Sequence, residues 1–477
     1  MYLYLSNKEK LDLLKTQEFT ISKNVLINHL TTIKKNTLNL IEDLSVCKSF
    51  ISVENDNCMN PIYWQLGHIL HFYIVHTLNL LNTTKRLHFN ILNSYIKQIE
   101  KQYKIDFNDF FDSFKTPRHI RFSKIICIKR LIIVYKSIIK ILYNFIKNTK
   151  LTCVDNYLIM LSILHNDMHN ENFIFSYYNL QNNFLDSIIH ISISNNLNEP
   201  RVENIFIDIP KGFLHQGQDI NENRLVFDNE TPSFLIRINE FKVSKYPITE
   251  YEYLDFVNND GYINATYWSQ NGLDWKNEND IKHPLYWFNI SDIWYRKHFN
   301  NIYKIGSNLP VCNISWYEAE AYCKWKDVRL IKESEWEYLA TNLGRNLYPW
   351  GDQPPNPNIC NINNINNINI NNINNINNIN NYCTNVKLYE TGNNIKGISQ
   401  LIGNVWEWCE EDLYPYNNFT MDCVYKEMSY PFFGKKKICR GGCFAVNDFL
   451  IHSKYRNAQE PGCQIQFSGF RVCLKSS

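Results

Sequence analysis

The stretch Leu401–Trp408, with the sequence LIGNVWEW, decides how the second half of this chain folds. Trp406 and Trp408 alternate along it, as the inward side chains of a half-buried strand do. Gly403 precedes the tryptophans and suits a tight backbone turn, because glycine accepts conformations that other residues avoid. We therefore predict a strand that begins after a turn, with a mainly structural role.

Two further motifs extend this pattern toward the C-terminus. They are ICRGG (438–442) and SGFRV (468–472), and each places an arginine beside glycine or an apolar residue. Arginine forms two-pronged hydrogen bonds with carboxylates, which makes it suitable for buried ion pairs. We predict that Arg440 and Arg471 are buried anchors paired with acids such as Glu407.

The whole region from residue 200 to 477 has the composition of one α+β domain. Trp, Gly and Pro become frequent after Pro200, and long helical periods disappear. Short apolar runs predict strands, and two amphipathic runs predict helices. The predicted elements are strands at Phe234–Arg237 and Phe241–Val243, and helices at Trp316–Lys326 and Glu333–Ala340. The repeated Asn-Asn-Ile tract at 361–381 is predicted to be a surface-loop insertion.

The region from residue 1 to 196 has helical periodicity and little Gly or Pro. The arrangement predicts a helical bundle, with Asn60 as the N-cap of the second helix and Pro61 as its first residue. The four predicted helices cover approximately 25–48, 61–84, 124–148 and 153–180.

Charge and cysteine content exclude several classes of protein. With 49 Lys+Arg against 47 Asp+Glu, the formal charge of +2 gives no strong field for nucleic acid or an anionic membrane. Lysines interrupt the apolar stretch 125–146, which indicates an amphipathic helix and not a membrane span. The N-terminus lacks a secretory signal pattern, and the 14 cysteines form no CxxC pair. We therefore expect a cytoplasmic protein with mostly free thiols.

Histidines in the first half form a candidate metal site. His165 and His169 are four residues apart in LHNDMHNEN (164–172), so they share one face of a predicted helix. A third ligand could come from the second helix, where His68 lies close to His71 and His76. Three imidazoles from two helices would leave metal positions open for substrate and dioxygen. Residue spacing alone does not choose among the three candidates for the third ligand.

Eight motifs in the second half occur in the order found in formylglycine-generating-enzyme-like domains. These domains are also called sulfatase-modifying factor domains, and the resemblance implies their C-type-lectin-like α+β fold. The family's copper-dependent thiol oxidases need two cysteines after the RGG motif, but this chain has Val446 and Ile451 there. The motifs are FDNE (227–230), FKVSKYPITEYEYLDFV (241–257), LPVCNISWYEAEAYCKW (309–325), VRLIKESEWEYLA (328–340), YPWGD (348–352), LIGNVWEW, ICRGG and SGFRV.

The first half resembles the DinB-like iron-binding domain of the ergothioneine-type sulfoxide synthases. The resemblance rests on WQLGHI (64–69), followed about a hundred residues later by the HxxxHxE pattern. It implies a DinB-like four-helix bundle whose Fe(II) is held by His68, His165 and His169. The implied activity is an O2-dependent oxidoreductase reaction that joins the imidazole of histidine or hercynine to a cysteine-type thiol.

The same resemblance implies roles for further residues. A tyrosine between the GNVWEW and RGG motifs donates a proton in the family, and Tyr416 and Tyr425 are the candidates here. The carboxylate of a thiol substrate would be clamped by arginine. Arg118 and Arg121 match a region where the family has such an arginine, and Arg456 is another candidate. Met168 stands where the family often has a glutamine that contacts the imidazole substrate.

Departures from the family pattern leave alternatives open. Gln459 and Cys463 replace the acid and the arginine of enzymes that use γ-glutamylcysteine. The HNDMHNE context is closer to a branch that includes selenoneine synthases, which couple a selenosugar to hercynine. A non-catalytic ligand-binding module on the same fold is a third possibility.

Overall fold

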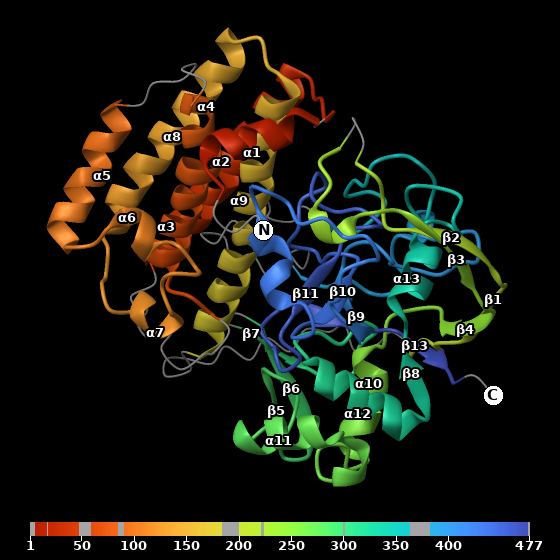
Figure 1. Ribbon diagram of the computed structural model, residues 1–477. Helices are drawn as coiled ribbons and strands as arrows, with labels where there is room; N and C mark the ends of the chain where they lie inside the picture. The colour runs from red at the N-terminus through yellow and green to blue at the C-terminus, as the bar shows by residue number, and fades with distance from the viewer. Residues whose placement is uncertain are drawn as a thin grey trace. The chain divides into compact units, whose positions relative to one another are not determined.

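The computed structural model describes residues 5–16, 18–46, 59–83, 90–183, 200–220, 224–298, 301–362 and 382–475. The chain forms two compact units (Figure 1). The helical unit comprises Met1–Leu180, Asp219–Thr231 and Asn418–Tyr430, and the mixed unit comprises Gln181–Gln218, Pro232–Asn417 and Pro431–Ser477. Residues 196–199 of the predicted domain boundary, and residues 363–381 of the Asn-Asn-Ile tract, lie outside the described residues.

Long helices dominate the helical unit. α8 packs against α2, α3 and α5, and the outward face of α8 carries the four exposed lysines that the sequence placed there. Each fully buried apolar side chain of α8, such as Leu131, contributes about 1.5–3 kcal/mol. The helices are α1 (Asn7–Leu13), α2 (Lys23–Val46), α3 (Ile62–Phe72), α4 (Asn79–Thr83), α5 (Asn90–Tyr103), α6 (Phe107–Phe110), α7 (Arg118–Arg121), α8 (Ile128–Asn148) and α9 (Cys153–Asn183).

The second predicted helix differs from its prediction in two respects. α3 begins at Ile62 with Pro61 as its N-cap, so the expected cap at Asn60 is wrong by one residue. A π-helical turn, Tyr73–Leu78, separates α3 from α4. Such turns carry one extra residue and are frequent near functional sites. None of the helices in the described ranges is both long enough and apolar enough to span a membrane.

Small sheets and short helices form the mixed unit. One sheet has the strand order β1-β4-β13-β8, and a second has the order β11-β10-β9-β12. A third sheet is the pair β2-β3, and a fourth is the antiparallel set β5-β6-β7. The strands are β1 (Phe206–Ile209), β2 (Gly212–Gln216), β3 (Phe234–Ile238), β4 (Phe241–Ser244), β5 (Trp287–Ile290), β6 (Ile293–His298), β7 (Asn301–Lys304), β8 (Val328–Leu330), β9 (Trp406–Asp412), β10 (Lys437–Arg440), β11 (Asn457–Gln459), β12 (Ser468–Gly469) and β13 (Val472–Leu474).

The predicted helices of the mixed unit are confirmed with their predicted bounds. They are α12 (Trp316–Lys326) and α13 (Glu333–Ala340), and the two predicted strands correspond to β3 and β4. The structure adds α10 (Glu250–Asn258) and α11 (Gln270–Glu278), which the sequence analysis missed. Thr249 caps α10 in a capping box with Glu252, a local signal that was readable from the sequence.

Buried ion pairs organise the core of the mixed unit. Arg471 forms a two-pronged pair with Glu407, at 2.6 Å for both nitrogens. Arg440 is equally buried but pairs with Glu333 and Glu337, so the expected pairing with Glu407 is correct only for Arg471. Separating either pair would leave a buried charge without compensation, which is energetically costly. The pairs therefore hold the elements that carry these residues in one arrangement.

The LIGNVWEW strand is more deeply buried than expected. Trp406, Glu407, Trp408 and Cys409 are all buried, so the half-buried alternation is wrong. β9 lies between β10 and β12, and its side chains on both faces are buried from Trp406 to Cys409. Cys409, Cys312 and Cys323 are free thiols, in agreement with the expectation for the cysteines.

Candidate metal centre

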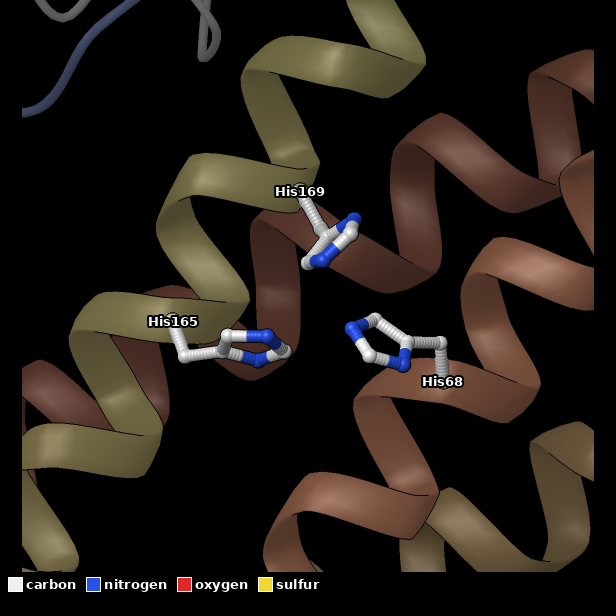
Figure 2. A group of neighbouring side chains, drawn as sticks. All are labelled: His68, His165 and His169. Carbon is white, nitrogen blue, oxygen red and sulfur yellow. The ribbon is translucent and has the colours of Figure 1, made fainter. Parts of the chain in front are cut away.

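Three histidines from two helices meet in the helical unit. His68 comes from α3, and His165 and His169 come from adjacent turns of α9. Figure 2 shows their rings turned toward one another. Their candidate ligand nitrogens all lie within 4.8 Å of one another. Three nitrogens that share one metal at about 2.1 Å lie about 3.0–3.6 Å apart, so the rings would have to move about 1–2 Å closer to bind one ion.

The environment of His68 leaves one nitrogen free for a ligand bond. Its Nδ1 lies 2.8 Å from the carbonyl oxygen of Phe111. Because a carbonyl can only accept, Nδ1 carries the proton and Nε2 keeps its lone pair. Gly67 makes this contact possible: a Cβ at this position would lie 1.9 Å from the Phe111 ring. The glycine before the histidine therefore lets the Phe111 segment approach α3.

A second contact of the same kind supports this segment. Trp64, one helical turn before His68, donates its indole N–H to the carbonyl of Phe110 at 2.8 Å. The Trp64 ring also stacks on the His68 ring, with centroids 5.2 Å apart. The carbonyls of Phe110 and Phe111 thus bind side chains from two consecutive turns of α3. Together with the Trp64 ring, they restrict the orientation of the His68 ring.

The two histidines of α9 have different surroundings. His165 stacks on Phe72 with ring centroids 3.8 Å apart. Its Nδ1 is buried and has no hydrogen-bond partner in the described part of the chain. The side-chain amide of Asn172 lies 3.4 Å from Nδ1 of His169. The amide nitrogen of Asn172 faces this atom and donates a hydrogen bond to it, whereas rotation of the amide would let its oxygen accept one from Nδ1–H.

Buried side-chain amides next to the α9 histidines hold α9 against α2 and α8. Asn166 accepts a hydrogen bond from the Tyr135 hydroxyl at 2.8 Å and donates to the Thr37 hydroxyl at 3.0 Å. Thr37 in turn donates to Asn170 at 2.8 Å. The residue after each α9 histidine is therefore tied to a neighbouring helix. This arrangement fixes the direction in which His165 and His169 project.

All three imidazoles are neutral near pH 7. Burial lowers the pKa of His68 to about 4, and it holds the pKa of His165 and His169 well below the usual value. Three neutral nitrogen donors fit a divalent transition metal, and one buried nitrogen of His165 has no hydrogen-bond partner among the described residues. Imidazole nitrogens suit iron, zinc, copper or nickel better than magnesium or calcium.

A tyrosine lies beside this cluster. Tyr425 belongs to the helical unit and packs edge-on against Phe72, with ring centroids 4.9 Å apart. Its ring centroid lies 5.5 Å from that of His165. Burial raises the pKa of Tyr425 well above its usual value, so the hydroxyl keeps its proton at neutral pH. Of the two tyrosines expected from the sequence, Tyr425 adjoins the histidines within one unit.

The other expected tyrosine has a different environment. Tyr416 belongs to the mixed unit, where the Arg456 guanidinium lies 4.1 Å from its ring centroid. Arg456 makes a buried ion pair with Glu333, at 2.7 and 3.0 Å. These contacts favour a structural role for Arg456, and its assignment to substrate binding stays a prediction.

The expected arginines of the helical unit bind protein carbonyls. Arg118 donates to the carbonyl of Met59. Arg121 donates to the carbonyls of Thr116 and Ser113, and to the side chain of Asn60. The Arg121 guanidinium also lies 4.0 Å from the Trp64 ring centroid. Met168 is half-buried and directly precedes His169 on α9. Their substrate contacts stay predictions.

Sequence reasoning missed the residues that position this cluster. Phe111 comes from a segment without a motif, and its role depends on a contact with a residue 43 positions away in the chain. The segment Asp219–Thr231, which contains the FDNE motif, packs with the helical unit, and no feature of the sequence indicated this. The asparagines that follow His165 and His169 were a readable signal in the sequence. An Asn on the buried face of a helix needs a hydrogen-bond partner, which indicates contact with another element.

Comparison with known proteins places the chain in a family. Residues 195–476, more than half of the chain, match the family described as Sulfatase-modifying factor enzyme 1-like domain. The chain belongs to this family. As a sulfatase-modifying-factor-like protein, it has two buried apolar side chains, Val446 and Ile451, where thiol oxidases of the family need cysteines.

Curated relatives of this sulfatase-modifying-factor-like chain include three named hercynine oxygenase. The protein from Mycobacterium tuberculosis is 29% identical over 54% of this chain and 57% of its own length. The protein from Mycolicibacterium smegmatis is 28% identical over 57% of this chain and 62% of its own length. The chain thus matches little more than half the length of these relatives. The structure of PvdO from Pseudomonas aeruginosa covers 57% of this chain at 16% identity, with a TM-score of 0.38.

Proposed function

We propose that this protein is an iron(II)- and O2-dependent sulfoxide synthase. It would join the imidazole of histidine or hercynine to a cysteine-type thiol. The observation that carries the proposal is the group of three neutral histidines with Tyr425 beside it. The relatives named hercynine oxygenase support the choice of an imidazole substrate.

The proposal includes a DinB-like four-helix bundle as the host of the metal. Its long helices would be α2, the α3–α4 segment, α8 and α9. His68, His165 and His169 would hold iron and leave the rest of its coordination sphere to substrates. When bound, the iron would supply the capacity to activate dioxygen and to lower the pKa of a substrate thiol.

Tyr425 would act as the proton donor. Its hydroxyl retains a proton at neutral pH, since burial raises its pKa. Its ring lies against Phe72, which also stacks on His165. General acids work best when they are held within hydrogen-bond reach of the accepting atom. The packing on Phe72 would hold Tyr425 on the side of the cluster where His165 lies.

Arg121 would help to bind a substrate carboxylate. Its hydrogen-bond partners in the described residues are neutral acceptors. Burial and the nearby Arg118 lower the pKa of its guanidinium to about 10, while the carboxylate of Asp112 acts in the opposite direction. A half-buried guanidinium with no hydrogen-bonded carboxylate among the described residues is stabilised when an anion binds nearby. Trp64 separates Arg121 from His68, so the carboxylate would lie at the edge of the cluster.

A product screen tests the proposal. Purified protein is loaded with iron(II) without oxygen, and air is then admitted with hercynine or histidine plus cysteine, γ-glutamylcysteine or a selenosugar. A coupled sulfoxide seen by mass spectrometry, and absent from His165→Ala protein, would support the proposal. A coupled selenium product without any sulfoxide would replace it with a selenoneine synthase. No product and no iron binding would favour a ligand-binding module.

A further inference from the structure

The Asp422 carboxylate joins two segments of the helical unit that are far apart in sequence. One carboxylate oxygen accepts a hydrogen bond from the hydroxyl of Tyr157 on α9. The other accepts from the backbone N–H groups of Val424 and Tyr425, both at 2.6 Å. The backbone N–H of Asp422 donates to Asp228 at 3.1 Å. Both oxygens of the carboxylate are therefore used within this unit.

These contacts connect Tyr425 to the helix that carries two of the three histidines. Tyr157 lies eight residues before His165, which is about 12 Å along the axis of a continuous helix. A helix of this length moves as one body over such a distance. The Tyr157–Asp422 hydrogen bond thus fixes the backbone of Tyr425 relative to His165.

The segment that bears Tyr425 has little regular structure. Within 418–430 this structure consists of one 3-10 turn, Lys426–Met428, and the first residue of a second, Tyr430. Apolar contacts of Tyr425 with Phe72 and Phe227 hold its ring but do not set the direction of the hydroxyl. The hydrogen bonds to Asp422 are directional, and they act on the backbone N–H of Tyr425 itself.

We propose that Tyr157 and Asp422 are positioning residues for the Tyr425 hydroxyl. They would act through Tyr425 and would touch neither metal nor substrate. This inference rests on the proposed function for the part that Tyr425 plays in turnover. The placement of the Tyr425 ring is a separate claim that can be tested without any reaction.

Double-mutant kinetics test the role in turnover. Tyr157→Phe removes one hydroxyl, and we expect turnover at saturating substrate to fall about 10- to 100-fold, the range that small misplacements cause. In a Tyr425→Phe background the same change should have no further effect, because both act through one group. Tyr103→Phe is the matched control, since its hydroxyl accepts from Cys127 N–H at 2.9 Å elsewhere in the unit. Multiplying effects in the double mutant would overturn the proposal.

Variants of Asp422 separate positioning from folding. Asp422→Asn keeps an acceptor for the two N–H groups and offers an amide to Tyr157, so it should retain most turnover. Asp422→Ala removes all of these contacts and should match Tyr157→Phe or exceed its loss. Iron stoichiometry should stay at the wild-type value in both variants. Equal losses in the Asn and Ala variants would overturn the proposal.

A fluorine probe tests placement without turnover. 3-Fluorotyrosine introduced at position 425 should give one sharp 19F resonance in iron-free protein. Tyr157→Phe should shift or broaden it, and Tyr103→Phe should leave it unchanged. An unchanged resonance in Tyr157→Phe would overturn the inference even if the enzyme is active. A changed resonance in a protein that forms no product would uphold the placement while the proposed function fails.

Discussion

The carbonyl oxygen of Phe111 lies 2.8 Å from Nδ1 of His68, and the ring of Phe111 occupies the space beside Gly67. Phe111 thus selects the tautomer of His68, a candidate ligand. Its ring fits beside α3 because Gly67 has no side chain. The pairing links a sequence feature, glycine before histidine, to the donor properties of the metal centre.

Gly67→Ala should weaken metal binding without touching a ligand. The new Cβ would overlap the Phe111 ring, so the ring and its carbonyl must move away from α3. We expect a loss of about 1–3 kcal/mol in unfolding free energy. Iron affinity should fall about 10- to 100-fold, as after loss of an outer hydrogen bond. Urea unfolding and iron titration measure the two effects.

Gly272→Ala in α11 is the matched control for Gly67→Ala. Its new Cβ would meet side-chain atoms at 3.2–3.4 Å, which need only small adjustments. Stability should change by no more than about 1 kcal/mol, and iron affinity should not change. Equal iron affinities in the Gly67→Ala and wild-type proteins would refute the role given to Phe111.

Removing an α9 histidine should abolish stoichiometric iron. His165→Ala and His169→Ala each delete one of three nitrogen donors. Affinity should fall by more than the roughly 100-fold that loss of an outer partner can cause. His119→Ala, an exposed histidine of the same unit, should bind iron as the wild type does. Metal analysis after gel filtration measures the iron content of each variant. Full iron occupancy in both α9 variants would contradict the assignment of these histidines as ligands.

Asp228 should make stability fall as pH rises. Burial raises its pKa from 3.8 to about 7. The native state then binds more protons than the unfolded state between these values, so unfolding free energy decreases from about pH 4 to pH 7. Asp228→Asn mimics the protonated form and should flatten this slope. Urea midpoints at pH 5 and pH 8 compare the variants, with exposed Asp208→Asn as the control.

Arg471→Ala should strongly destabilise the mixed unit. The change would leave Glu407 buried with a charge that Arg471 no longer compensates. Loss of one partner of a buried pair costs about 3–5 kcal/mol. Arg345→Ala, at an exposed position of the same unit, should cost less than about 0.5 kcal/mol. Calorimetry that shows similar melting temperatures for the two variants would contradict the buried pair as an anchor.

The sequence predicted local features well where one residue period dominated. The lysine stripe of α8 and the bounds of α12 and α13 follow from side-chain periodicity and capping, which act over a few residues. The N-cap of α3 was misplaced by one residue. The burial of β9 was underestimated, because covering of its second face depends on elements far away in the chain.

For the candidate site, the sequence by itself determined that histidine side chains supply the donors. The spacing of His165 and His169 put two imidazoles on one helix face, since the period of an α-helix is a local property. Only the tertiary structure decided that His68 meets them, and that Tyr425 and not Tyr416 shares their unit. The physical reason is that packing joins residues about 100 to 260 positions apart, and no local rule specifies such contacts.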